Sequence, residues 1–400
     1  MPAYLSGFRC IGPECEDHCC YGWDIIVDKR SCQRYRKLTS TGLGKSIRQA
    51  LRRNRKDPSN ASYARFLRTG ETCPLLTSDR LCRIHAELGE DFLPDTCAVF
   101  PRHFRGRKEW IDVSASLACP EIAARALDNP HGIEIVEAHI DPAEAGMLRA
   151  VEPRLSSEIE AAGLVLRAFA LSLLKDKRYA LWRRILALGL LLEMVSLTEA
   201  ASGTGNMPSL LSAFKRRMDS GEWMELIENA PALTGLQLQL ARRLHDEIVS
   251  GVRVKALKEC ADECFAGLDY SGEQPFTDDV AQRYDSAYDQ YYRPFFEAYG
   301  FMLENYLVNY LLHHDLCFHQ GRRLYEDYVM MVLNFTMLKT YLIGMAAWHR
   351  EGMNTALLTR LTYSFTKVVE PDGRFRDYAL GLLAQSGCTD MMHLAVLIKN

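Results

Sequence analysis

The stretch RCIGPECEDHCCYGWDIIVD, residues 9–28, decides how this chain is read. It places four cysteines within eleven residues, in the spacing C-x4-C-x3-C-C. Further cysteines occur in TCPLLTSDRLCRIHAELG (72–89), LPDTCAVFPRHF (93–104) and LACPE (117–121). With Cys32, nine of the thirteen cysteines fall in the first 119 residues. This density is typical of ligands for a metal or cluster, and it indicates where the chemistry lies.

Disulfides, zinc and an iron–sulfur centre are three explanations for such a cluster. A disulfide framework belongs to small exported domains that bury too little core. This chain has 400 residues and shows no signal peptide in MPAYLSGFRC, so we expect free thiols. Structural zinc usually shows paired CxxC knuckles, and the sequence contains none. Thiolate sulfur suits zinc and iron–sulfur clusters alike, so the spacing leaves both open.

At these residues a family is recognisable. The run FRCIGPECEDHCCYGWDIIVDK (8–29), followed by LCRIHAELGEDFLPDTCAVFPR (81–102) and SLACPE (116–121), resembles the flagellin lysine-N-methylases, the bacterial FliB-type proteins. The first 120 residues are also similar to cysteine-rich iron- or zinc-chelating proteins. The resemblance implies methyl transfer from S-adenosylmethionine to flagellin lysine ε-amines, in the cytoplasm, with a [4Fe-4S] cluster in the cysteine-rich part.

The resemblance also implies a set of eight metal ligands, with zinc as the alternative metal. These are Cys10, Cys15, Cys19, Cys20, Cys73, Cys82, Cys97 and Cys119. Cys32 does not belong to the family pattern. Eight thiols are too many for one tetrahedral zinc ion, whereas a cubane offers four positions on a larger body. Our order of preference starts with Cys15, Cys19 or Cys20, Cys82 and Cys97, followed by Cys10, Cys73 and Cys119.

The fold is predicted to be mainly α. We expect a cysteine-rich domain with little β at 1–125 and a helical domain at 126–400, subdivided near 201–208. WDIIVD (23–28), EWIDVSAS (109–116) and the segment 129–142 alternate like short strands. A break at Pro153 should separate two helices in 143–176, and 178–200 reads as a buried helix, too short to span a membrane. Further helices are expected at 209–230, 233–266, 278–315, 322–350, 353–369 and 375–398.

Common cofactor motifs are missing. Gly42–Gly44 and Gly203–Gly205 are the only G-x-G candidates for a nucleotide-binding turn, and neither follows a convincing strand. TGLGKS (41–46) lacks the first P-loop glycine. The C-x3-C-x2-C signature of radical S-adenosylmethionine enzymes is absent as well. The catalytic residues and the S-adenosylmethionine-binding residues are therefore unknown from the sequence.

The helical part holds weaker candidates. Segment 284–310 is the richest in aromatic rings, and its tyrosines suit either a lysine channel or a helical core; they are Tyr284, Tyr288, Tyr291 and Tyr292. Three acids are able to serve as bases only if they face inward: Asp285, Glu297 and Glu304. Two interpretations remain for His313, His314 and His319. They either form a second metal site or occupy surface or loop positions. Cys260 and Cys264 are predicted to be packing residues.

Charge is unevenly distributed. The formal charge is +6 through Cys119 and −9 for the remainder. Much of the excess positive charge lies at 45–68. This segment is interpreted either as a solvated helix face or as a docking surface for an acidic protein. Nucleic acid is disfavoured as a partner because aromatics that stack on bases are not interleaved there.

Two functions of different class follow. One is a flagellin lysine methyltransferase that uses S-adenosylmethionine. The other is a non-catalytic metal-carrying or redox-sensing protein that binds a partner through its helical part.

Overall fold

The computed structural model describes most of the 400 residues and divides them into two units. It leaves undescribed 23–24, 39–40, 57–58, 71, 140–150, 152–154, 203–206, 222–230, 251–253, 271–276, 371–372, 388–389 and 400. Unit 1 comprises Met1–Arg125 and Glu134–Arg154, and unit 2 comprises Ala126–Ile133 and Leu155–Asn400. The first break thus falls after Arg125, and the chain returns to unit 1 in a segment that the sequence analysis gave to the helical part.

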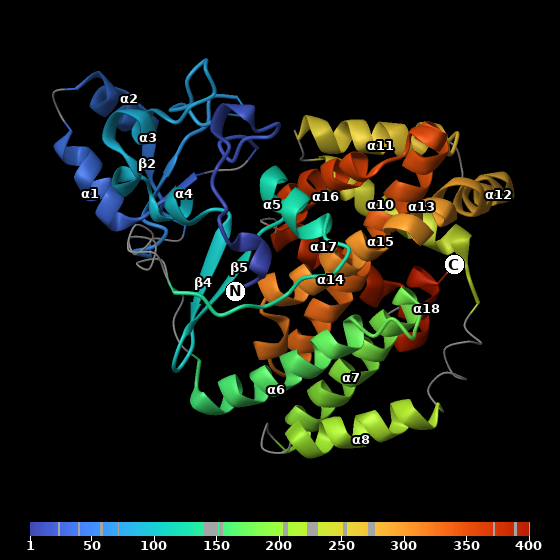
Figure 1. Ribbon diagram of the computed structural model, residues 1–400. Helices are drawn as coiled ribbons and strands as arrows, with labels where there is room; N and C mark the ends of the chain where they lie inside the picture. The colour runs from blue at the N-terminus through green and yellow to red at the C-terminus, as the bar shows by residue number, and fades with distance from the viewer. Residues whose placement is uncertain are drawn as a thin grey trace. The chain divides into compact units, whose positions relative to one another are not determined.

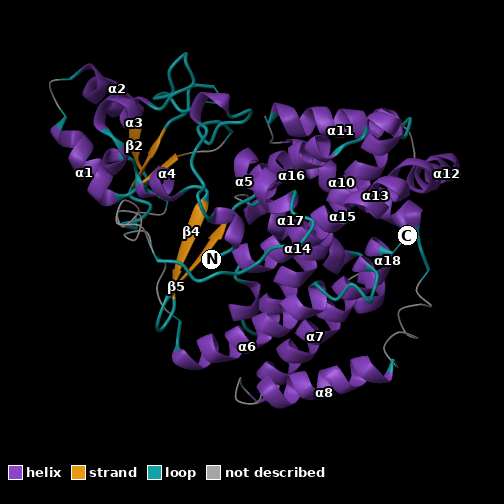
Figure 2. Ribbon diagram, viewed as in Figure 1, coloured by secondary structure: helices purple, strands orange, loops and turns teal. Residues whose placement is uncertain are grey.

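Unit 1 combines short helices with two small antiparallel sheets (Figure 1, Figure 2). Its strands are β1 (Ile25–Val27), β2 (Leu51–Arg53), β3 (Ala64–Phe66), β4 (Arg102–Gly106) and β5 (Ile111–Ala115). Its helices are α1 (Lys29–Lys37), α2 (Gly42–Ala50), α3 (Arg83–Leu88), α4 (Asp95–Val99) and the first turns of α5 (Pro120–Leu127), with 3-10 turns at Ala3–Leu5, Gly12–Glu14 and Glu90–Phe92.

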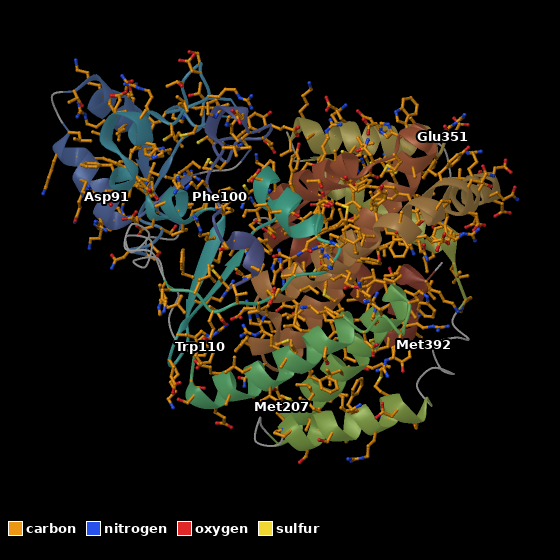
Figure 3. All side chains as sticks on the ribbon, in the orientation of Figure 1. Asp91, Phe100, Trp110, Met207, Glu351 and Met392 are labelled. Carbon is orange, nitrogen blue, oxygen red and sulfur yellow. The ribbon has the colours of Figure 1, made fainter. Side chains whose placement is uncertain are left out.

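The three-stranded sheet has the order β1-β3-β2. Alternate residues of β1 and β3 are buried, as two-residue periodicity requires: Ile25, Val27, Ala64 and Phe66. The strand predicted in WDIIVD is therefore confirmed at β1, and EWIDVSAS contains β5. In the β4–β5 hairpin, Trp110 lies at the tip (Figure 3), and its indole N–H donates to the Asp112 carboxylate at 3.1 Å.

Two further expectations for this unit need correction. Residues 45–68 are not one helix, because the chain leaves α2 after Ala50 and forms β2, which pairs with β3. Buried residues at 64 and 66 follow a strand period and not a helical one. The predicted edge strand at 129–142 is reduced among the described residues to one bridge between Ile135 and Pro2.

Unit 2 is helical (Figure 2), which confirms the predicted fold class. Its helices are α6 (Ser157–Leu174), α7 (Leu181–Ser202), α8 (Met207–Ser220), α10 (Thr234–Ser250), α11 (Lys255–Gly267), α12 (Asp278–Ala287), α13 (Arg293–Tyr299), α14 (Phe301–His313), α15 (Gly321–His349), α16 (Thr355–Val369), α17 (Gly373–Gln385) and α18 (Met391–Ile398). A π-helical turn spans Tyr288–Tyr292, and 3-10 turns span Leu316–Phe318 and Arg350–Gly352.

Helix α15 is the core of this unit. Nearly all its residues from Leu324 to Ala346 are buried, and α7, α10, α11, α16 and α18 pack against it. By length and composition it is the one candidate membrane span among the described residues, yet its apolar window is entirely buried by protein. A helix that is apolar all round is expected at the centre of a large bundle.

Helices α11 and α15 cross at two glycines. A Cβ at Gly344 would come within 2.5 Å of the Cys264 sulfur, and one at Gly267 would overlap the Gly344 carbonyl. Cys260 and Cys264 are both fully buried in α11 at this crossing. The prediction that these cysteines are packing residues is confirmed.

Several predicted helices are continuous where expected, and three are broken. The expectations at 178–200, 322–350 and 353–369 correspond to α7, α15 and α16. The segment 278–315 is interrupted by the π-helical turn and again at Gly300, and 375–398 is interrupted near Gly387, whose positive φ of 67° ends a helix. The segment 233–266 forms two helices, α10 and α11. Pro153 and residues 203–206 of the predicted 201–208 linker lie outside the described residues, while α7 ends at Ser202 and α8 begins at Met207.

Candidate metal centre

The Cys19–Cys20 loop and the Cys73 segment are joined by their backbones. The N–H of Cys73 donates to the Cys20 carbonyl at 2.8 Å, and Tyr21 forms a bridge with Thr72. Cys73 is buried in the hydrophobic core of unit 1, and Cys20 packs against the same core. Two cysteine-bearing segments that are some fifty residues apart in sequence are thereby placed side by side.

Cys82 is brought back to the same place by a turn. The Leu81 N–H donates to the Thr77 hydroxyl at 3.0 Å, and Leu76 forms a bridge with Cys82. Cys82 is the N-cap residue of α3. Burial raises the pKa of this thiol, although hydrogen bonds from the His85 and Ile84 N–H groups oppose the rise.

Cys97 lies on α4, a helix fixed by Asp28. The Asp28 carboxylate accepts from the N–H of Ser31 at 2.8 Å, which caps α1, and from the N–H of Asp95 at 3.0 Å, in the first turn of α4. The Tyr35 hydroxyl donates to the Phe92 carbonyl at 2.6 Å. Burial raises the pKa of Tyr35, and so does the neighbouring Cys97 thiol.

Four thiols from these segments interact with one another in every pairing. Burial raises the pKa of Cys97 far above its ordinary value, and the Cys19, Cys82 and Cys73 thiols raise it further. Burial also raises the pKa of Cys73 to about 11, with contributions from Cys82 and Cys19. Cys19 raises the pKa of Cys82 in turn. Cys73 is buried in the hydrophobic core of unit 1, and Cys82 and Cys97 pack against that core.

Cys20 is the fifth thiol of this group. A side-chain hydrogen bond with Cys19 raises the pKa of Cys20 strongly, and burial and the Cys97 and Cys73 thiols add to it.

Cys10, Cys15 and Cys119 form a second group. The Cys10 and Cys119 thiols each interact with Cys15, Cys10 also interacts with Cys119, and Cys19 of the first group raises the pKa of Cys15 as well. Burial raises the pKa of Cys119 to about 12. The Arg102 and Arg125 guanidinium groups lie 4.9 and 6.0 Å from the Phe8 ring, which holds the loop before Cys10 close to α5.

Cys32 faces another environment. It is buried on α1, where burial raises the pKa of its thiol while Arg36 and Arg53 lower it. The groups that change its pKa are these two arginines and Asp28, although Cys32 lies in the same hydrophobic core as Cys73.

The sequence analysis missed two residues that arrange these loops. Asp28 follows a strand and precedes a helix, a position that signals an N-cap, but its second bond to Asp95 is not visible in sequence. Arg80, at a positive φ of 62°, donates to the His18 ring and to the Cys15 carbonyl. It therefore ties the Cys15–Cys19 loop to the turn before Cys82.

Within the described residues, no three Cys, His, Asp or Glu side chains are arranged around a point where one metal ion would sit. The thiols of the first group are near enough to interact but do not converge as single-ion ligands do. The donors of this group are all thiols, a ligand type that suits zinc and iron–sulfur clusters alike.

The candidates in unit 2 have structural partners. Tyr284 and Tyr292 are buried and Tyr288 is half-buried, as an aromatic core requires. Asp285 and Glu297 are exposed, whereas Glu304 is buried and pairs with Arg184 at 2.6 Å. None of the three acids is both turned inward and unpaired.

The three histidines pair with carboxylates. His313 and His314 each lie 3.6 Å from a different oxygen of Glu370, and His319 pairs with Asp327. His313 is buried, so its surface or loop reading is wrong: it occupies the last turn of α14. The reading of these histidines as a second metal site finds no support among the described residues.

Comparisons with known proteins identify relatives. The lysine-N-methylases of Salmonella choleraesuis and Salmonella typhimurium are each 34% identical to this chain over 139 residues. Each alignment covers 35% of this chain and 35% of the relative, about a third of either protein. The flagellar biosynthetic protein FliU of Salmonella muenchen is 34% identical over 136 residues, which is 34% of this chain and 80% of FliU. No solved structure matches.

The helical unit carries the most extensive match. The family described as FliB lysine N-methylase C-terminal domain matches residues 167–397 and so covers α7 to α17 in full. Because this match extends over more than half of the sequence, the chain belongs to the FliB lysine N-methylase family.

Proposed function

We propose that this protein transfers methyl groups from S-adenosylmethionine to lysine ε-amines of flagellin, and that unit 1 carries a [4Fe-4S] cluster. The observation that carries the proposal is the family match over 167–397, together with relatives named lysine-N-methylase and FliU. Flagellin as the substrate and the cytoplasm as the location agree with a flagellar modification enzyme.

The thiols of unit 1 support the cluster. Five of them, Cys19, Cys20, Cys73, Cys82 and Cys97, raise one another's pKa, and five thiols are more than one tetrahedral ion uses and enough for the four ligand positions of a cubane. When bound, a cluster of this kind links the segments that hold it and is able to exchange an electron. The chain contributes burial, since Cys73 is in the core and Cys20, Cys82 and Cys97 pack against it.

The reaction makes modest demands. A lysine ε-amine is protonated at neutral pH, so it must lose a proton before its nitrogen attacks the methyl carbon of the donor. The carbon–sulfur bond then breaks, and sulfur keeps the electron pair as a thioether. In unit 2, His313 and His314 lie beside Glu370 and His319 lies beside Asp327, and an imidazole oriented by a carboxylate is suited to accepting a proton.

A second candidate function is metal carriage or redox sensing without catalysis. It is favoured by the position of the thiols, which gather in unit 1, outside the residues of the family match. In that case the helical unit would bind a partner without modifying it.

One experiment separates the two. Protein prepared without air is incubated with flagellin and S-adenosylmethionine, and intact flagellin and its peptides are weighed. Methyl-sized mass increments on lysine support the methylase, with a reaction lacking S-adenosylmethionine as control. Unmodified flagellin, from protein whose iron content and fold are intact, argues for the carrier.

A further inference from the structure

His319 lies near the end of a buried turn that joins α14 to α15. The turn begins at Asp315, whose φ of 54° is in the left-handed region that residues other than glycine rarely adopt. Its 3-10 segment, Leu316–Phe318, is buried. After His319 the chain is fixed to α7, because the Gly321 N–H donates to the Glu199 carboxylate at 3.1 Å. The imidazole therefore extends from a backbone that is held on both sides, as a precise catalytic group requires.

The His319 ring is held by a buried carboxylate. Its Nδ1 pairs with one oxygen of Asp327, and the other oxygen accepts from the Arg376 guanidinium on α17. The Asp327 side chain is 9% exposed, whereas that of His319 is 23% exposed. Among the residues that the structure describes, none forms a hydrogen bond with the other ring nitrogen, Nε2. A carboxylate that accepts from Nδ1–H fixes the tautomer in which Nε2 is free to take a proton.

Asp327 is ionised in this setting. Burial alone would raise the pKa of its carboxyl, but hydrogen bonds and charge from His319 and Arg376 outweigh burial and hold the pKa below its ordinary value. A fixed negative charge at Nδ1 stabilises the imidazolium that forms when Nε2 takes a proton. Further charged and titratable groups of the neighbouring elements surround this turn: Arg167, Glu199, Tyr310, His313, His314, Arg323, Glu326 and Glu370.

Other histidines that pair with carboxylates differ from His319. His313 and His314 turn Nε2, not Nδ1, towards Glu370. His393 does pair through Nδ1 with the carboxylate that caps α18, but both side chains are exposed, so solvent screens their charges. A buried carboxylate at Nδ1 and an unpartnered, partly exposed Nε2 occur together at His319.

Resting on the proposed function, we propose that His319 is the catalytic base of the methyl transfer and that Asp327 is its positioning residue. Nε2 of His319 takes a proton from the ε-ammonium group of the substrate lysine, so one N–H bond breaks and another forms. The neutral amine then attacks the methyl carbon of S-adenosylmethionine. The carbon–sulfur bond breaks, and its electron pair stays on sulfur. Asp327 remains ionised throughout, because Arg376 and the new imidazolium both neutralise it.

The variant H319A tests this role. It should lower kcat for flagellin methylation at neutral pH by at least about a hundredfold, since a positioned base contributes about 10²–10⁴-fold, while KM for flagellin changes little. Added imidazole should restore part of the rate, which it would not do for a merely structural residue. D327N should also be slow, because an amide no longer fixes the tautomer. H393Q, at the exposed pair, is the matched control and should be as active as the native protein.

The pH profile gives a further readout. The native rate should fall in acid, where His319 is protonated, and be nearly level above neutrality. The rate of H319A should instead rise by roughly tenfold per pH unit, because only lysine that has already lost its proton can then react.

Chemical modification gives a readout that does not depend on methyl transfer. Diethyl pyrocarbonate acylates an unprotonated imidazole nitrogen, and peptide mass spectrometry locates the product. In the native protein it should modify His319 before the buried His313, and flagellin should slow that modification. Urea unfolding of H319A shows whether lost activity reflects a lost fold.

The outcomes separate this role from the proposed function. Native protein that leaves flagellin unmethylated overturns both together. If the native protein is active, a near-native rate for H319A overturns the role of His319 alone. The same holds if His319 resists diethyl pyrocarbonate while His313 reacts, if flagellin does not slow its modification, or if the activity of H319A is lost with its fold and imidazole does not restore it.

Discussion

The Asp28 carboxylate accepts a hydrogen bond from the backbone N–H of Asp95, 67 residues further along the chain. Its other oxygen caps α1 through the Ser31 N–H, so a single buried side chain anchors two helix N-termini. The second helix, α4, carries Cys97.

Replacing Asp28 by alanine should therefore destabilise unit 1. Two caps are lost and two buried N–H groups are left without partners, for a total of about 2–4 kcal/mol. Limited proteolysis, followed by mass spectrometry of the fragments, should show earlier cleavage within residues 1–139 and unchanged cleavage in the helical unit. As a control, D390A removes the exposed cap of α18 and should cost about 1 kcal/mol or less. Equal protection of unit 1 in D28A and the native protein contradicts the double cap.

The same carboxylate predicts a pH dependence. Burial by itself would raise the pKa of Asp28, but hydrogen bonds from the Ser31 and Asp95 N–H groups outweigh it and hold the pKa below its ordinary value. A depressed carboxylate pKa stabilises the folded protein fully above the unfolded pKa, and this contribution is lost as the pH falls through the folded pKa. The stability difference between native protein and D28N should thus be largest near neutrality and shrink in acid. A difference independent of pH, measured by urea unfolding, argues against an ionised Asp28.

Local patterns made part of this fold predictable. The long apolar segment of α15 and the alternation in β1 and β5 follow directly from side-chain periodicity. The breaks in 278–315 were not predictable in this way, because the π-helical turn at Tyr288–Tyr292 continues the helical pattern while changing its register.

The grouping of the cysteines was not predictable from local sequence patterns either. From the sequence, the density and residue type of the thiols predicted a metal or cluster site in the first 119 residues. It did not identify which thiols meet, because that depends on contacts such as Cys73 to Cys20 and Asp28 to Asp95, which join distant segments. Cys15 interacts with Cys10 and Cys119, and also with Cys19.

Gly344 should tolerate no side chain. G344A places a methyl group against the Cys264 backbone and sulfur at the crossing of α11 and α15. Since neither helix has room to move within a packed core, we expect a loss of about 1–3 kcal/mol, or more if α11 is displaced. Unfolding in urea followed by circular dichroism measures it. G352A is the matched control, since a Cβ there meets nothing within 4 Å; a similar loss in both variants contradicts the close crossing.

The buried pair Arg184–Glu304 should be structural. Arg184 donates to the Glu304 carboxylate at 2.6 Å and to the Leu174 carbonyl at 2.5 Å. E304A leaves a buried guanidinium without its counter-ion, and we expect a cost of about 3–5 kcal/mol. The double variant R184M/E304M should recover most of that stability. If E304A is instead stable and abolishes only methyl transfer, Glu304 is a catalytic base and this interpretation is wrong.

Lys339 should give the stability of the protein a second dependence on pH. A lysine that gains a partner on folding usually has a raised pKa, whereas the pKa of Lys339 is lowered. Burial lowers its pKa to about 7, and its amine donates to the Ile398 carbonyl at 2.8 Å, at the end of α18. Between that value and the ordinary lysine pKa, the unfolded state binds more protons than the folded state, so stability should rise with pH by up to about 1.4 kcal/mol per unit. K339M should lose this rise between pH 7 and 9. A parallel pH profile for both proteins shows that Lys339 is charged in the fold.

The last prediction concerns substrate docking by the cationic surface of α2 and β2. Replacing arginines there by glutamate should weaken flagellin methylation, since clustered like charges speed encounter with an acidic partner and lose effect in salt. The structure shows which positions test this cleanly. Arg52 donates to the Gln49 carbonyl at 2.7 Å and so caps α2, and the Arg53 guanidinium lies 3.4 Å from the Tyr63 ring centre, so both also support the fold.

Arg55 and Lys56, both exposed beyond the end of β2, are the better positions. R55E/K56E should slow methylation at low salt by roughly tenfold and flatten its salt dependence, because the change acts on encounter and not on chemistry. Iron content and unfolding midpoint should stay unchanged. R216E/R217E, on the exposed side of α8, reverses the same number of charges elsewhere and should have little effect. If R55E/K56E and the native protein methylate flagellin at equal rates at low salt, this surface is solvated and does not dock the substrate.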